Sequence, residues 1–196
     1  MKKTIILGVF LPLCMVVVFF GCTTRKPAVS TIPGGFKTFS MYGFSFKYPA
    51  DFSMVRMGRP GKEADDRSGV VIVSREYPDS KLWAYQVTWF ETTSTYNEKI
   101  LEGNIEEALA GLESTEGIFS VERGKIVNAE KSEDPMLYRH YSSASTEGEK
   151  VFGIVSSFYC PKNSKVFAVM TMRSSAVSDE EVLQDFLGFM DSFSCY

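Results

Sequence analysis

From residue 36 to about residue 91, segments of the chain alternate between apolar and polar residues. A two-residue alternation of this kind is typical of a half-buried β-strand. Phe44, Phe46 and Tyr48 are separated by polar residues, which gives one strand an aromatic face, and Pro49 then ends it. A partner strand is predicted just before it, joined through a turn at 42–43. The same reasoning predicts further strands over residues 70–74 and 82–91.

The period changes to that of an amphipathic helix after residue 94. Thr95 and Glu98 have the spacing of a capping box, in which a hydroxyl and a carboxylate satisfy the free amides of a helix start. Ser178 and Glu181 have the same spacing near the end of the chain. The residues expected on the buried faces of the two helices are Leu101, Ile105, Ala108, Leu109 and Leu112, and Val182, Phe186, Met190 and Phe193.

Between the helices the pattern predicts four consecutive strands, separated by residues that favour turns. The expected ranges are 119–130, 137–144, 150–159 and 166–173. Strands, a helix, a four-stranded meander and a closing helix predict an α+β fold. We expect a single domain with an antiparallel β-sheet flanked by helices, an α/β/α sandwich, over residues 36–196.

The N-terminus resembles the signal of bacterial lipoproteins. Lys2 and Lys3 precede an apolar stretch over 5–20, and Gly21 supplies the small residue before Cys22. The resemblance implies cleavage after residue 21 and lipid modification, of the palmitate type, on Cys22. The alternative, an uncleaved transmembrane helix over 4–20, is disfavoured because that run is short for a membrane span and is interrupted by glycine and proline.

Residues 22–35 contain small polar residues and prolines without apolar periodicity, so we expect a flexible tether from Cys22. Thr23 replaces the aspartate that holds many lipoproteins at the inner membrane. The expected location is therefore the bacterial cell envelope, lipid-anchored, with outer-membrane placement favoured.

The segment Tyr42-Gly-Phe-Ser-Phe-Lys-Tyr-Pro-Ala-Asp-Phe52 is similar to the opening motif of PsbP-like domains, with Phe52 where tryptophan is usual. The closing Phe189-Met-Asp-Ser-Phe193 agrees in order and spacing. This fold is shared by photosystem PsbP, the Ran-binding Mog proteins and many small bacterial lipoproteins. The resemblance implies an accessory or binding module, and it implies no functional residue because the matching positions are core positions.

The formal net charge is −3, with 21 basic and 24 acidic residues, and it falls to −5 when Lys2 and Lys3 leave with the signal. A mildly acidic chain lacks the basic footprint of nucleic-acid binding proteins, so no nucleic-acid partner is expected. Cys160 and Cys195 remain after Cys14 and Cys22 are assigned to the signal and the anchor. In an oxidising compartment a disulfide between them is favoured over two buried thiols.

Catalytic chemistry is not indicated. His140 is the only histidine, and it has no companion in a recognisable catalytic motif, so it is interpreted as an ordinary strand residue. We expect no enzyme activity, no cofactor and no metal. Two acids at 65 and 66 lack the number of oxygen ligands that calcium needs.

The loop over 56–69 carries most of the candidate contact residues, because glycines and a proline exclude a regular element and binding residues concentrate on such loops. The alternative is a solvated connection without function. The candidates are Arg56, Arg59, Lys62, Asp65, Asp66 and Arg67.

Aromatic residues are abundant, with 16 Phe, 9 Tyr and 2 Trp. Most are expected in the core, although those on the Trp83–Trp89 strand, Tyr138 and Tyr141 are candidates for a groove or partner surface. The sequence therefore predicts a membrane-anchored, non-catalytic interaction module with an envelope protein as partner. A carrier or sensor of a small apolar ligand is the alternative, and a hydrolase is a third and weaker one.

Overall fold

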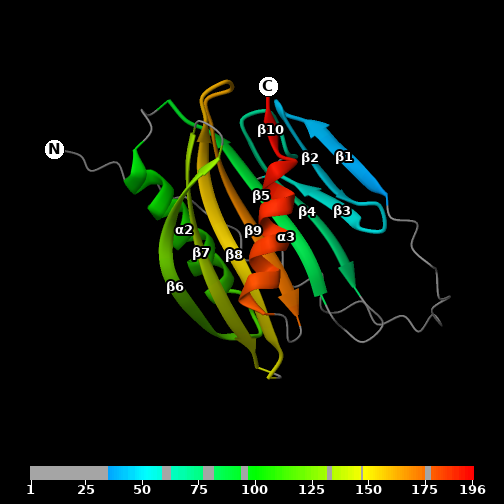
Figure 1. Ribbon diagram of the computed structural model, residues 1–196, viewed down its shortest axis with the longest axis vertical. Coiled ribbons are helices and arrows are strands. Elements are labelled where there is room, and N and C mark those ends of the chain that lie inside the picture. Colours follow the sequence, from blue (N-terminus) through cyan, green and yellow to red (C-terminus); the bar gives the residue numbers. More distant parts are fainter. Residues whose placement is uncertain are drawn as a thin grey trace.

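The computed structural model describes residues 35–58, 63–76, 82–93, 97–131, 134–146, 148–174 and 178–196 (Figure 1). The predicted signal, Cys22 and the tether up to residue 34 lie outside these described residues. Arg59 and Lys62 of the candidate loop lie outside them as well.

A large antiparallel sheet of seven strands forms the centre of the domain. Its order is β3-β4-β5-β9-β8-β7-β6, so the predicted four-strand meander is confirmed as one half of the sheet. The strands are β3 (Ser53–Met57), β4 (Ser68–Glu76), β5 (Leu82–Glu91), β6 (Ile118–Lys131), β7 (Asp134–Ser145), β8 (Lys150–Cys160) and β9 (Lys165–Ser174).

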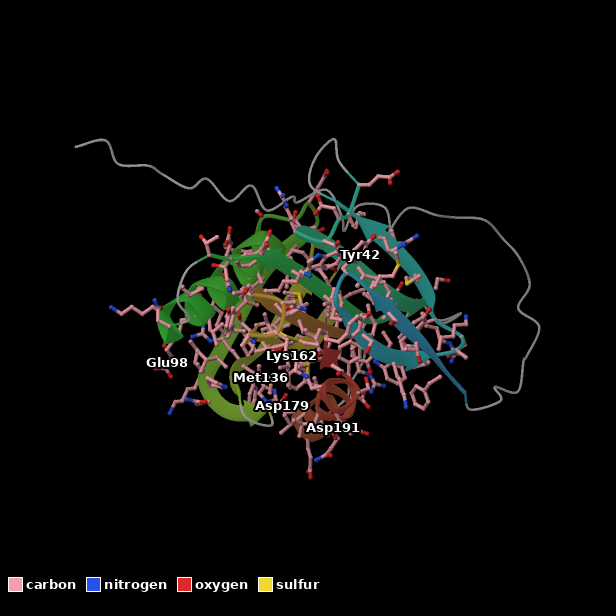
Figure 2. The ribbon with its side chains drawn as sticks, turned by 90° about the horizontal axis from the view of Figure 1, so that it is seen from above. Tyr42, Glu98, Met136, Lys162, Asp179 and Asp191 are labelled. Atoms are coloured by element: carbon pink, nitrogen blue, oxygen red, sulfur yellow. A yellow bond between two sulfur atoms is a disulfide. The ribbon has the colours of Figure 1, made fainter. Side chains whose placement is uncertain are left out.

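The two helices lie on opposite faces of this sheet, as Figure 2 shows from above. α2 (Glu98–Glu113) packs on β6, β7, β8 and β9. α3 (Asp179–Asp191) packs on the other face, next to a second sheet of three strands. That sheet has the order β1-β2-β10, from β1 (Phe36–Met41), β2 (Phe44–Pro49) and β10 (Ser194–Cys195). The α+β prediction is confirmed, and the second sheet and the strands β3 and β10 were not predicted.

The β1–β2 hairpin turns at Tyr42 and Gly43, both of which have a positive φ, 57° and 77°. Two consecutive residues of this conformation give the twist that suits a two-residue hairpin, and glycine adopts it without steric cost. The turn sets the register that places Phe39 opposite Phe46. Phe39, Phe44, Phe46 and Tyr48 are all buried, which confirms the predicted aromatic face of β2.

One of the two predicted helix caps is correct. Ser178 accepts the backbone N–H of Glu181, and the Glu181 carboxylate accepts the N–H of Ser178, which completes a capping box. α2 begins differently, because Asn97 directly precedes the first helical residue and its Oδ1 accepts the N–H of Ile100 at 3.0 Å. Thr95 lies outside the described residues. Because Asn97 is the N-cap, Glu98 is the first residue of the helix and not the third, so the predicted Thr95–Glu98 capping box was wrong.

Aromatic rings fill the layer between α3, the small sheet and the large sheet. Tyr85 stacks on Phe189 with ring centroids 4.5 Å apart, and Phe46 lies 5.0 Å from the same ring. Phe44 lies 5.0 Å from Phe167 of β9. These contacts join four elements, β2, β5, β9 and α3, into one aromatic core.

The core on the α2 side is more aliphatic and includes one buried phenol. The hydroxyl of Tyr141 donates to the backbone oxygen of Thr171 at 2.8 Å. Burial raises the pKa of Tyr141 above its ordinary value of 10.0, because a phenolate would lose its hydration there.

A disulfide between Cys160, at the end of β8, and Cys195 of β10 ties the small sheet to the large one. The two Cα atoms are 6.5 Å apart, within the range that a disulfide bridges. Neither helix of the described part of the chain is long and apolar enough to cross a membrane.

Candidate interaction surface

Strand β3 ends the large sheet and presents apolar side chains to solvent. Met54 is 41% exposed and Val55 is 52% exposed, on opposite faces of the strand. The register pairs Met54 with Val73 of β4, so Met54 points to the face that carries α3 and the small sheet. A terminal strand with apolar side chains is the part of a sheet most able to accept a further strand.

Arg56 connects this strand to the edge of the small sheet. It lies on the same face of β3 as Met54, and its Nη1 donates to the Sδ of Met41 on β1 at 3.0 Å. Met41 is itself 40% exposed. Met41, Met54 and Arg56 thus lie on one side, and Val55 lies on the opposite face of β3. We call these four exposed residues, on the terminal strands of two sheets, the β3 margin.

The second half of the neighbouring loop is held firmly by its own backbone. Asp65 Oδ1 accepts the backbone N–H groups of Arg67 and Ser68 at 2.8 and 2.9 Å. The backbone N–H of Asp65 donates to the oxygen of Ser68 at 3.1 Å, which closes a tight turn. The indole N–H of Trp89 donates to the backbone oxygen of Asp65 at 3.0 Å. Residues 65–68 thus form a turn that hydrogen bonds hold against the buried Trp89, while residues 65–67 are exposed, as the alternative of a solvated connection expects.

Gly69 allows the loop to approach Trp89 so closely. A Cβ atom at this position would lie 2.4 Å from Cζ2 of the indole and 2.8 Å from the Cβ of Ala64. On the other side of the indole, the ring of Tyr42 stacks at a centroid distance of 4.9 Å. Trp89 therefore carries both the β3–β4 loop and the β1–β2 turn.

The remaining charged candidates of the loop differ in their surroundings. Asp66 and Arg67 are exposed, and Arg67 lies 3.8 Å from Glu91 in an open ion pair that contributes little to stability. Asp65 uses its carboxylate to cap the turn. In the described part of the chain no group of three potential metal ligands comes together, so the structure gives no support to a cation site at 65–66.

His140 lies on β7, beside Tyr138 with ring centroids 6.1 Å apart. Its place on a strand of the central sheet agrees with the interpretation as an ordinary strand residue. The hypothesis of an aromatic groove was wrong for Tyr85, Trp89 and Tyr141, since each is at most 5% exposed.

Sequence reasoning missed the aromatic residues that are exposed, Phe36 at 72% and Tyr196 at 58%. Phe36 precedes Phe39 by three residues, and an odd spacing along a strand places two side chains on opposite faces. That spacing was a usable signal. Met54 and Val55 were missed because a five-residue strand between a turn and a loop shows too little alternation to be recognised.

An apolar ligand between the large sheet and α3 would have to displace packed side chains. Phe186 is fully buried there, and Tyr85 and Phe189 stack directly on each other. This packing disfavours the carrier or sensor alternative at that position.

No protein-family model matches this chain, and no curated protein matches it. Among solved structures, the Ran-binding protein Mog1p of Saccharomyces cerevisiae is similar with a TM-score of 0.49 and 14% identity over 83% of this chain and 96% of that chain. The cyanobacterial PsbP of Synechocystis sp. PCC 6803 has a TM-score of 0.47 and 10% identity over 88% of this chain and 98% of that chain. The likeness is one of overall fold, and no binding residue is carried over from either protein.

Proposed function

We propose that this protein is a membrane-anchored lipoprotein of the cell envelope that acts as a non-catalytic interaction module. The observation that carries the interaction part is the β3 margin, which places three exposed apolar side chains and one arginine on the terminal strands of two sheets. Exposed apolar groups gathered at one place are typical of surfaces that bind a partner.

The proposed partner segment is an extended stretch of an envelope protein that adds a strand beside β3. Backbone hydrogen bonds would provide affinity in this mode, and side chains at alternate positions would provide specificity. Met54 and Val55 point to opposite faces of β3 and would therefore contact side chains on the two opposite faces of the added strand. Arg56 favours an acidic residue in the partner at that end.

The anchor part of the proposal rests on the sequence around Cys22. A lipid there would confine the domain to a membrane surface and raise its effective concentration near partners in the same membrane. Incorporation of labelled fatty acid into the wild-type protein, and its loss in Cys22→Ala, tests this part separately. Labelling that persists in the variant would refute it.

The interaction part is tested by photo-cross-linking in cells. A photoreactive amino acid is placed at Met54 or Val55, with exposed positions Glu102 on α2 and Gln184 on α3 as controls. We expect one adduct of discrete mass at both β3 positions and not at the controls. The adduct formed from position 55 should disappear when Met54→Lys is added, because a lysine there cannot be buried against an added strand. Equal cross-linking at all four positions, or none at β3, would refute the proposed surface.

A further inference from the structure

The outer face of the three-stranded sheet carries an exposed aromatic ring at each end. Phe39 of β1 points inward and is buried, so the alternation of the strand points Phe36, Thr38 and Ser40 outward. Phe36 is the first residue of β1 and is 72% exposed. We call this surface, with Phe36, Thr38, Ser40, Ser45, Lys47, Ser194 and Tyr196, the outer face.

Tyr196 is held across the outer face by hydrogen bonds. Its backbone N–H donates to the oxygen of Gly43 at 3.0 Å, and its hydroxyl donates to the oxygen of Phe44 at 3.3 Å. The same hydroxyl lies 3.0 Å from Oγ of Ser40 on β1. The ring is nevertheless 58% exposed, so it is fixed in place and still open to a partner.

The charge of this sheet differs from that of the rest of the chain. Its strands contain Lys37 and Lys47, both exposed, and no aspartate or glutamate, whereas the whole chain has more acids than bases. Asp51, the acid that follows β2, is paired with Arg75 of the large sheet. Lys47 lies on the outer face, whereas the alternation of β1 points Lys37 to the opposite face, together with Phe39. The strands of the outer face thus contribute one basic and no acidic side chain to it, a charge that suits anionic lipid headgroups.

The chain leading to the proposed anchor enters this same sheet. As the tether that the sequence predicts, the thirteen residues between Cys22 and Phe36 would span roughly 20 Å root-mean-square. A lipid on Cys22 would therefore keep Phe36 within about that distance of the headgroups. Tyrosine and other amphipathic aromatic side chains are favoured in this interfacial layer, where one end of the ring is apolar and the other is hydrated.

From these observations we infer that the outer face lies against the surface of the anchoring membrane, with Phe36 and Tyr196 at the level of the headgroups and Lys47 facing anionic lipid. The inference rests on the proposed membrane anchoring and adds a definite orientation to it. Such docking would prevent the domain from rotating freely on its tether, so that one fixed side of the domain would face partners in the envelope.

The test uses the chain from Cys22 onward, coupled through the Cys22 thiol to a maleimide lipid in vesicles. Because Cys160 and Cys195 are joined and Cys14 leaves with the signal, Cys22 is the reactive thiol of this chain. Chemical coupling supplies the tether whether or not cells lipidate Cys22, so the orientation is tested independently of the anchor. The vesicles are phosphatidylcholine alone or phosphatidylcholine with phosphatidylglycerol.

A photoreactive amino acid replaces Phe36 or Tyr196, and in control proteins Glu102 or Gln184. We expect phospholipid adducts, detected by mass, to be several-fold more abundant at positions 36 and 196 and to increase with phosphatidylglycerol. Equal lipid adducts at all four positions would overturn the inference, and so would adducts at 36 and 196 between protein copies in place of lipid.

Two charge reversals provide the matched control. Lys47→Glu should reduce the lipid adduct at Phe36 several-fold, whereas Lys99→Glu, which changes the net charge equally at an exposed site on α2, should leave it unchanged. An equal reduction by both variants would show attraction through net charge alone and would overturn the docking of this face. Tryptophan fluorescence of each variant verifies that the aromatic core is intact.

Discussion

Removal of the Cys160–Cys195 disulfide should destabilise the domain substantially, because the bond closes a long loop and joins the two sheets. The cysteines are 35 residues apart, and the closed loop contains β9 and α3. The chain-entropy relation gives about 4 kcal/mol for a loop of this length at 25 °C. For a domain of this size that corresponds to a fall in Tm of roughly 8–16 °C.

The assay is urea unfolding followed by tryptophan fluorescence, since Trp89 is buried in the core next to the small sheet. The oxidised wild type is compared with Cys160→Ala/Cys195→Ala, in which no buried hydroxyl is introduced at the Cys160 site. Cys22→Ala is the matched control, because it removes a cysteine outside the domain and should leave the unfolding midpoint unchanged. Mass analysis after alkylation, with and without reduction, establishes the state of the cysteines in each sample.

A loss of less than about 1 kcal/mol in the double variant would refute the entropic argument, since it would lie far below the range for a loop of this length. Hydrogen exchange adds a spatial test. The amides of β2 that face β10 should exchange faster in the double variant, whereas those of the β7–β8 pair should not. Uniformly faster exchange would mean that the bond supports the whole domain and not the joint between the sheets.

Three further outcomes follow from the packing and the titratable groups. Gly69→Ala should lower the free energy of unfolding in urea by about 1–3 kcal/mol, because the new methyl group would overlap the Trp89 ring. Gly103→Ala, at an open helical position, should be neutral or stabilising by up to about 1 kcal/mol. Equal effects of the two substitutions would contradict the packing argument. Ser178→Ala should cost about 1 kcal/mol at neutral pH. The hydrogen bonds from the backbone and hydroxyl of Ser178 lower the pKa of Glu181 below its ordinary 4.5. The capping contribution is therefore present above pH 4.5 and is lost as the pH falls through the pKa of Glu181 in the folded protein. A stability difference between variant and wild type that does not shrink in acid would contradict this linkage. Because burial raises the pKa of Tyr141, the wild type should lose stability above pH 10, where the phenol of the unfolded chain ionises. Tyr141→Phe should lose less stability over the same pH range, measured by urea unfolding at each pH. Parallel pH profiles of the two proteins would contradict the linkage to Tyr141.

The parts of the fold that follow from local pattern were predictable, because periodicity and helix capping depend on residues that are close together in the sequence. The β1–β2 hairpin, the four-strand meander and the capping box at Ser178 are of this kind. The second sheet was not predictable in this way, since β10 is two residues long and pairs with a strand near the start of the domain. Such pairing is decided by tertiary packing of Phe44, Phe46 and Phe193 and leaves no periodic signal.

The candidate site was predicted only in part for a similar reason. Charge and glycine content drew attention to the loop over 56–69, and the loop does border the exposed β3 margin. The fixed turn at Asp65 depends on Trp89, which lies 24 residues away in the sequence, and this contact cannot be read from the loop itself. Likewise, the exposure of Met41 and Met54 follows from both strands ending their sheets, which is a property of topology.

The small sheet joins the beginning of the domain to its end, with Tyr196 contacting Ser40 across 156 residues of sequence (Figure 1). During synthesis from the N-terminus, the β1–β2 hairpin emerges early, but its third strand and the helix that covers it emerge last. Phe44 and Phe46 must therefore stay uncovered until nearly the whole domain has been made. A chain interrupted even a few residues before Ser194 would present this apolar hairpin to chaperones and proteases, so completion of the small sheet would distinguish chains that extend through Ser194 from chains that stop earlier.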